Sequence, residues 1–81
     1  MNTYYNIKLS LVYYRYMDFV YVLFSDTGEW EDIVIIVSKE QAINASIKYP
    51  NQRVEIFSKT DTYGYKPTYN YYKNGEFIHN S

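Results

Sequence analysis

Three runs in the N-terminal half of the chain have hydrophobic patterns that predict β-strands. In residues 7–14 the apolar side chains recur at every second position, a spacing typical of a strand. Residues 19–24 are apolar on both faces, and residues 30–37 form a third run rich in β-branched side chains. Between these two runs lies Asp26-Thr27-Gly28, a turn signal. We therefore expect the second and third strands to form a hairpin.

A helix is predicted over residues 39–49. Ser38 begins a capping box, in which its hydroxyl accepts from the amide of Gln41 and the Gln41 side chain returns a bond. Pro50 ends the helix, because proline lacks an N–H and disfavours helical geometry in the preceding residue. The stripe that we expect to face the sheet is Ala42, Ile43, Ser46 and Ile47.

The C-terminal half predicts three more strands, over residues 53–58, 68–73 and 76–79, with a loop over residues 59–67. Asn74-Gly75 predicts a two-residue type I′ turn between the last two strands, since this turn needs positive φ at both positions. The predicted order is β-β-β-α-β-β-β. The chain is therefore expected to be a single α+β domain, a small antiparallel sheet of about five to six strands with one helix packed on one face.

This architecture leaves one face of the sheet to be explained. The strand over residues 19–24 is apolar on both sides, and the strand over residues 30–37 also places apolar side chains on both. A single helix covers one face only. Strong curvature of the sheet, a homodimer or a partner protein could each cover the second face, and the sequence leaves these alternatives open.

Composition limits where the protein acts. Its 81 residues make one domain, and the absence of cysteine is typical of a reducing compartment. We see no signal-peptide pattern, and the apolar runs are too short to span a bilayer, so we expect a cytoplasmic protein without membrane contact. The net charge of −1 argues against direct nucleic-acid binding, because proteins that bind phosphate backbones are usually basic.

No pattern in the sequence indicates catalysis, a metal or a cofactor. His79 is the only histidine, and no serine or lysine is accompanied by a recognisable base motif. No glycine-rich loop precedes the predicted helix, so there is no phosphate-binding cradle. We therefore predict a non-enzymatic protein that needs no cofactor.

Twelve tyrosines are the most unusual feature of the composition. Part of this excess has a genomic cause, because the six residue types with AT-rich codons total 39 residues whereas Gly, Ala, Arg and Pro total nine. Tyrosine also suits binding surfaces, since it offers a large contact area with few torsions to freeze. The alternative is that these rings pack across the predicted C-terminal hairpin. The candidate partner-binding residues are Tyr63, Tyr65, Lys66 and Tyr69.

A second candidate surface lies on the acidic hairpin between the second and third predicted strands, at Asp26, Glu29, Trp30 and Glu31. The function that we expect is protein interaction. The low-GC composition favours a small phage- or plasmid-encoded inhibitor that blocks a larger bacterial protein, such as a host defence or nucleic-acid-processing factor. The alternative is a ligand-binding or sequestering protein that stacks a nucleotide or sugar on tyrosine rings at the seam of a homodimer.

Overall fold

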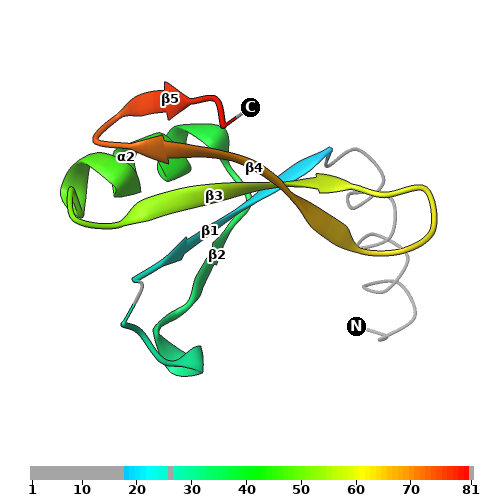
Figure 1. The fold of residues 1–81 in the computed structure, drawn as a ribbon, viewed down its shortest axis with the longest axis horizontal. Helices are drawn as coiled ribbons and strands as arrows, with labels where there is room; N and C mark the ends of the chain where they lie inside the picture. The colour runs from blue at the N-terminus through cyan, green and yellow to red at the C-terminus, as the bar shows by residue number, and fades with distance from the viewer. Residues whose placement is uncertain (1–17, 26, 81) are drawn as a thin grey trace, which may run out of the picture.

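The computed structural model describes residues 18–25 and 27–80, which form a five-stranded antiparallel sheet and one α-helix (Figure 1). The strand order across the sheet is β2-β1-β3-β4-β5, and every neighbouring pair is antiparallel. This confirms the predicted α+β class. The elements in chain order are β1 (Phe19–Phe24), the 3-10 turn η1 (Trp30–Asp32), β2 (Val34–Ile36), α2 (Lys39–Lys48), β3 (Arg53–Lys59), β4 (Tyr65–Lys73) and β5 (Glu76–Ile78).

The predicted strand over residues 7–14 lies outside the described residues. The predicted hairpin is present, because β1 pairs with β2 through Tyr21 and Ile36. Its second strand is shorter than expected: Trp30–Asp32 forms η1 instead. The cause is local, since the Asp32 carboxylate accepts from the Glu29 N–H at 2.9 Å and the Glu29 carbonyl accepts from the Asp32 N–H at 3.0 Å. Acidic side chains that bond nearby amides in this way compete with strand formation.

Helix α2 begins at its predicted cap and packs on the sheet through small side chains. The Gln41 N–H donates to the Ser38 hydroxyl at 3.3 Å, but the return bond predicted from the Gln41 side chain is absent; Tyr49 is the C-cap. Ala42 and Ser46 are fully buried. Ile47, expected on the buried stripe, is instead 53% exposed. It lies at the margin of the interface, beside the turn between β4 and β5, where the sheet covers only part of its side chain.

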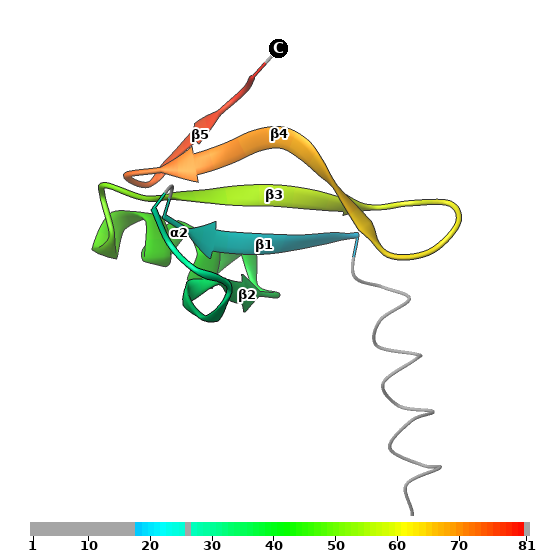
Figure 2. The same cartoon turned by 60° about the horizontal axis from the view of Figure 1, so that its bottom comes forward.

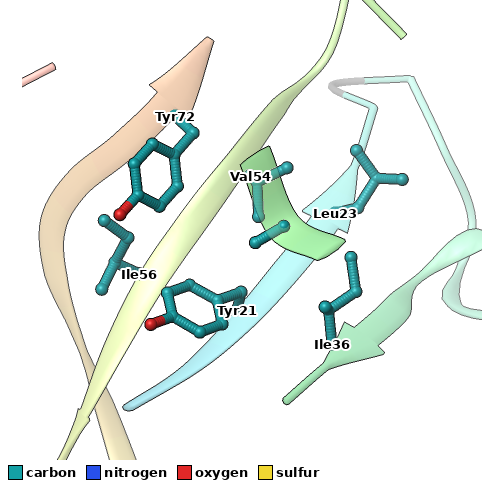
Figure 3. Close-up of a cluster of buried hydrophobic side chains, with 7 residues drawn as sticks. Tyr21, Leu23, Ile36, Val54, Ile56 and Tyr72 are labelled. Carbon is teal, nitrogen blue, oxygen red and sulfur yellow. The ribbon is translucent and has the colours of Figure 1, made fainter. Parts of the chain in front are cut away.

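The hydrophobic core lies between α2 and one face of the sheet (Figure 3). Its centre is Val54 on β3, which is fully buried between its register partners Leu23 and Tyr72. Because these partners alternate regularly along β1 and β3, the core draws on every second residue of the central strands. The cluster consists of Tyr21, Leu23, Ile36, Ala42, Val54, Ile56 and Tyr72.

Strand β4 begins earlier than the sequence predicts, so the expected loop over residues 59–67 shrinks to residues 60–64. The loop closes tightly, because Gly64 adopts a φ of 79° and its carbonyl accepts from the Thr60 N–H at 3.1 Å. Pro67 then lies within β4, opposite Phe57. Proline is tolerated there because β5 pairs only with Tyr71–Lys73, which leaves this part of β4 at the edge of the sheet.

The hairpin between β4 and β5 confirms the sequence prediction. Asn74 and Gly75 have φ values of 51° and 83°, as a type I′ turn requires. Lys73 pairs with Glu76, and the next two pairs follow in the expected register. Tyr71 and Tyr72 therefore point to opposite faces of the sheet, and Tyr71 lies beside Ile78.

Candidate functional site

In the part of the chain that the structure describes, one face of the sheet carries no helix. We call it the open face; α2, the only α-helix among residues 18–25 and 27–80, lies on the other side (Figure 2). A row of register partners crosses the open face through all five strands. Four of its members are hydrophobic, and only one, Glu55, is charged. The row consists of Ile35, Val22, Glu55, Tyr71 and Ile78.

An ion pair that lies against an aromatic ring occupies the end of the open face where β3 begins. The Arg53 Nε is 2.7 Å from a carboxylate oxygen of Glu55, and the Arg53 guanidinium lies 5.0 Å from the centre of the Tyr71 ring. Glu55 is 9% exposed, whereas nearly half of the Arg53 side chain reaches solvent. The ion pair offsets the cost of burying the carboxylate. It also holds the guanidinium over the ring, where its outer N–H groups can meet a partner.

A pocket adjoins this ion pair at the end of the open face where β3 begins. It has a volume of about 230 Å³, and polar and aromatic side chains line it together. Lys73 is held at its rim by a 2.8 Å bond to the Pro50 carbonyl. The positively charged side chains of Arg53 and Lys73, each held by a bond to another group, therefore line the pocket together with the Tyr71 ring. The lining residues are Phe24, Asn51, Gln52, Arg53, Tyr71 and Lys73.

The four tyrosine-segment candidates do not form one patch. Tyr63 is at the tip of the loop between β3 and β4 and is 89% exposed. Tyr65 pairs with Lys59, and alternation along the strands places both on the open face, near Phe57. Lys66 pairs with Ser58 and therefore lies on the opposite face. The structure thus brings Tyr65 to the open face and separates Lys66 from it.

Tyr69 lies in a bulge that the sequence pattern did not reveal. Three residues of β4, Thr68, Tyr69 and Asn70, stand opposite Ile56 of β3. The Thr68 hydroxyl stabilises the bulge, because it donates to the Ile56 carbonyl at 2.8 Å and accepts from the Asn70 N–H at 3.1 Å. Tyr69 adopts a left-handed φ of 69° and is 63% exposed. Strained backbone of this kind in an aromatic residue is typical of functional surfaces.

The second candidate surface lies in the connection between β1 and β2. Glu29, Trp30 and Glu31 are all exposed, and Trp30 reaches 87% exposure. Asp26 lies outside the described residues. Glu29 is the N-cap of η1 and Glu31 lies within it, so both belong to a turn and not to a strand. A groove of about 620 Å³ separates this connection from the C-terminal end of α2, with Glu31 on one side and Tyr49 on the other.

An aromatic groove on the α2 side of the sheet is the feature that sequence reasoning missed. Its volume is about 250 Å³, and Phe19 and Phe77 form its exposed walls with 45% and 55% exposure. Tyr72 forms part of the lining and packs edge-on against Phe77, with ring centres 5.9 Å apart. The groove joins the first and last strands of the described chain, so only the tertiary fold brings its walls together.

The described residues offer no metal centre, because no three His, Cys, Asp or Glu side chains among them lie close enough to share an ion. His79 stacks on Phe77 with ring centres 6.4 Å apart. Within residues 18–25 and 27–80, no helix has the length and hydrophobicity needed to cross a membrane. Comparison with known proteins found no matching family model, no matching curated protein and no matching solved structure.

Proposed function

We propose that this chain is a non-enzymatic interaction module that binds a larger protein through the open face of its sheet. The observation that carries the proposal is the row of side chains that crosses five strands on the face without a helix. Arginine and tyrosine are residue types that contribute strongly to protein interfaces, and Arg53 and Tyr71 lie together at the end of that face where β3 begins. Tyr65 and the loop tip at Tyr63 extend the same surface along β4.

The binding mode that this geometry supports is occlusion. A sheet face that carries a cation and aromatic rings can pack against the surface of another protein, and a stable complex needs about 800 Å² from each partner. A module with no catalytic chemistry of its own would act by covering a surface that the partner needs. The low-GC composition supports a phage- or plasmid-encoded inhibitor of a larger bacterial protein, acting in the cytoplasm.

A small ligand is a weaker candidate on geometric grounds. The proposed stacking on tyrosine needs neighbouring rings, whereas Tyr63, Tyr65 and Tyr69 stand on a loop, a strand face and a bulge. The most apolar hollow, the aromatic groove, measures about 250 Å³, below the roughly 300–1,000 Å³ of ordinary ligand pockets. The groove of about 620 Å³ beside η1 falls within that range, but Tyr49 is the only aromatic residue in its lining, so it offers no pair of rings for stacking a nucleotide or sugar.

The test is capture of the partner by the tagged chain from a low-GC bacterial host, followed by titration of the purified partner against two matched variants. Arg53→Ala removes a cation from the open face, and Lys66→Ala removes an exposed cation from the opposite face of the neighbouring strand. We expect Arg53→Ala to weaken binding by about 2 kcal/mol or more, and Lys66→Ala to leave it unchanged.

Folding must be separated from binding, because Arg53→Ala leaves the Glu55 carboxylate without its ion pair. Arg53→Lys keeps a positive charge beside Glu55 but loses the planar contact with Tyr71, so it should bind weakly while remaining folded. Equal binding by the wild type, Arg53→Ala and Arg53→Lys would show that the partner uses another surface. A small molecule that co-purifies in place of a protein would support the ligand-binding alternative.

A further inference from the structure

The two edges of the sheet are protected to very different degrees. At one edge, β5 has only three residues and carries Glu76, and the part of β4 beyond it contains Pro67 and the bulge at Tyr69. The tail after β5 also folds back, since the Asn80 N–H donates to the Asn70 side chain at 3.2 Å. Charges, prolines and bulges are the devices that keep edge strands from pairing with other chains.

At the other edge, β2 is equally short but contains no charge, proline or bulge. Its residues are Val34–Ile36, with Ile33 before them and Val37 after, so five successive β-branched aliphatic residues carry no charge. Exposure reaches 48% at Val34, 60% at Ile35 and 50% at Val37. Among the described residues β2 pairs with β1 alone, so its other side presents free backbone groups (Figure 1).

We propose that two copies of this chain pair antiparallel through β2, with Ile35 of each copy on the two-fold axis. This register places Val34 opposite Ile36 of the partner and Ile33 opposite Val37 of the partner. Antiparallel pairing keeps odd residues opposite odd ones, so the same faces meet and every cross-strand pair is aliphatic. The strand is therefore complementary to itself.

Charges at the two ends of β2 also favour a second copy as the occupant. The end at η1 is acidic, with Glu31 and Asp32, whereas the other end leads into α2, whose first two residues, Lys39 and Glu40, carry one charge of each sign. In the two-fold arrangement, Glu31 and Asp32 of each copy lie near Lys39 of the other copy. The dimer carries a continuous ten-stranded sheet, since each copy supplies five strands. Its two open faces join side by side, which doubles the surface proposed for the partner.

Sedimentation velocity of the full chain, from micromolar to millimolar concentration, tests the proposal through paired charge variants. Ile35→Lys places two lysines opposite each other on the axis, and Ile35→Glu places two glutamates there. Like charges directly opposite are destabilising, so each variant should raise the dimer dissociation constant by about tenfold or more. An equimolar mixture of the two variants should form a dimer again, because the opposed charges are then opposite in sign.

Control variants separate edge pairing from loss of the fold. Ile47→Lys makes the same change at a similarly exposed site, 53% against 60% for Ile35, but on α2, so it should dimerise like the wild type. Ile36→Lys is unsuitable, because Ile36 is 9% exposed and belongs to the core. If Ile35→Lys proves unfolded by circular dichroism, Val37→Lys takes its place and Ile33→Glu is its mixing partner in the same assay, because position 33 lies opposite position 37 in this register.

Three results would overturn the proposal. A wild type that stays monomeric at millimolar concentration would show that the β2 edge is not a self-pairing site. A dimer that survives Ile35→Lys would place the contact on another surface. A mixture of folded Lys and Glu variants that stays monomeric would contradict the two-fold register. None of these results bears on partner binding by Arg53, so the two proposals fail independently.

Discussion

The hydroxyl of Ser46, in the last turn of α2, accepts a 2.9 Å hydrogen bond from the N–H of Gly75 in the turn between β4 and β5. The same hydroxyl donates to the Ile43 carbonyl at 2.7 Å, so both of its roles are filled. Ser46 is fully buried. This single side chain therefore ties the helix to a hairpin that local sequence could form alone, and it sets where the helix lies along the sheet.

We expect Ser46→Ala to lower the free energy of unfolding by about 1–3 kcal/mol, because the Gly75 N–H loses its partner at a partly buried position. Urea denaturation measures the change. Asn44→Ala, at an exposed position in the same helix, is the control and should stay within about 0.5 kcal/mol. Equal midpoints for the two variants would mean that water replaces the hydroxyl without cost.

The two left-handed glycines form a matched pair for testing the hairpin turn. Gly75 and Gly64 have similar φ values, 83° and 79°. A Cβ added at Gly75 would lie 3.0 Å from the Ile47 side chain, whereas a Cβ added at Gly64 would have no atom within 4 Å. Valine at either site should cost about 1–3 kcal/mol in backbone strain. We expect Gly75→Val to lower the melting temperature more than Gly64→Val, since its branched carbons also meet Ile47. A larger loss of melting temperature in Gly64→Val than in Gly75→Val would contradict close packing of the Asn74-Gly75 turn against Ile47.

Stability should fall at alkaline pH because of one tyrosine. Burial raises the pKa of Tyr21 above its ordinary value of 10.0, and the neighbouring Tyr72 acts in the same direction. The folded state thus favours the neutral ring. The contribution of Tyr21 to stability is fully present below its ordinary pKa. That contribution is lost as the pH rises through the pKa that Tyr21 has in the folded protein. Melting temperatures from neutral pH to above the ordinary pKa should decline less steeply for Tyr21→Phe than for the exposed control Tyr63→Phe.

A structural feature could be predicted from the sequence when the residues that determine it lie close together in the chain. The turn at Asn74-Gly75 and the cap at Ser38 depend on residues within three positions of each other, and both are confirmed. The bulge at Tyr69 depends on Thr68 reaching a carbonyl of the neighbouring strand, which no periodicity along β4 records. A regular alternation was therefore expected where the structure has three residues opposite one.

The candidate sites divide in the same way. Exposure of Tyr63 follows from its place between Thr62 and Gly64 in a tight loop, which composition alone suggests. The cluster of Arg53, Glu55 and Tyr71 could not be predicted, since it needs the register between β3 and β4. The aromatic groove likewise needs Phe19 and Phe77 to meet across the fold. The sequence pattern predicted that one sheet face would need a cover, but not which side chains it would present.

The tyrosines should separate into two classes under alanine substitution. Tyr72 is 6% exposed and belongs to the core, so Tyr72→Ala should lower the free energy of unfolding by about 3–5 kcal/mol. Tyr63→Ala should leave it within roughly 0.5 kcal/mol, yet weaken partner binding by about 2 kcal/mol if that ring is a hot spot. Tyr65→Ala should weaken binding too, with a modest loss of stability because that ring is half-buried. Calorimetric titration at two salt concentrations should show a weak salt dependence, whereas a steep slope would indicate nucleic acid. Wild-type affinity in both Tyr63→Ala and Tyr65→Ala would move the binding surface to the exposed turn at Trp30.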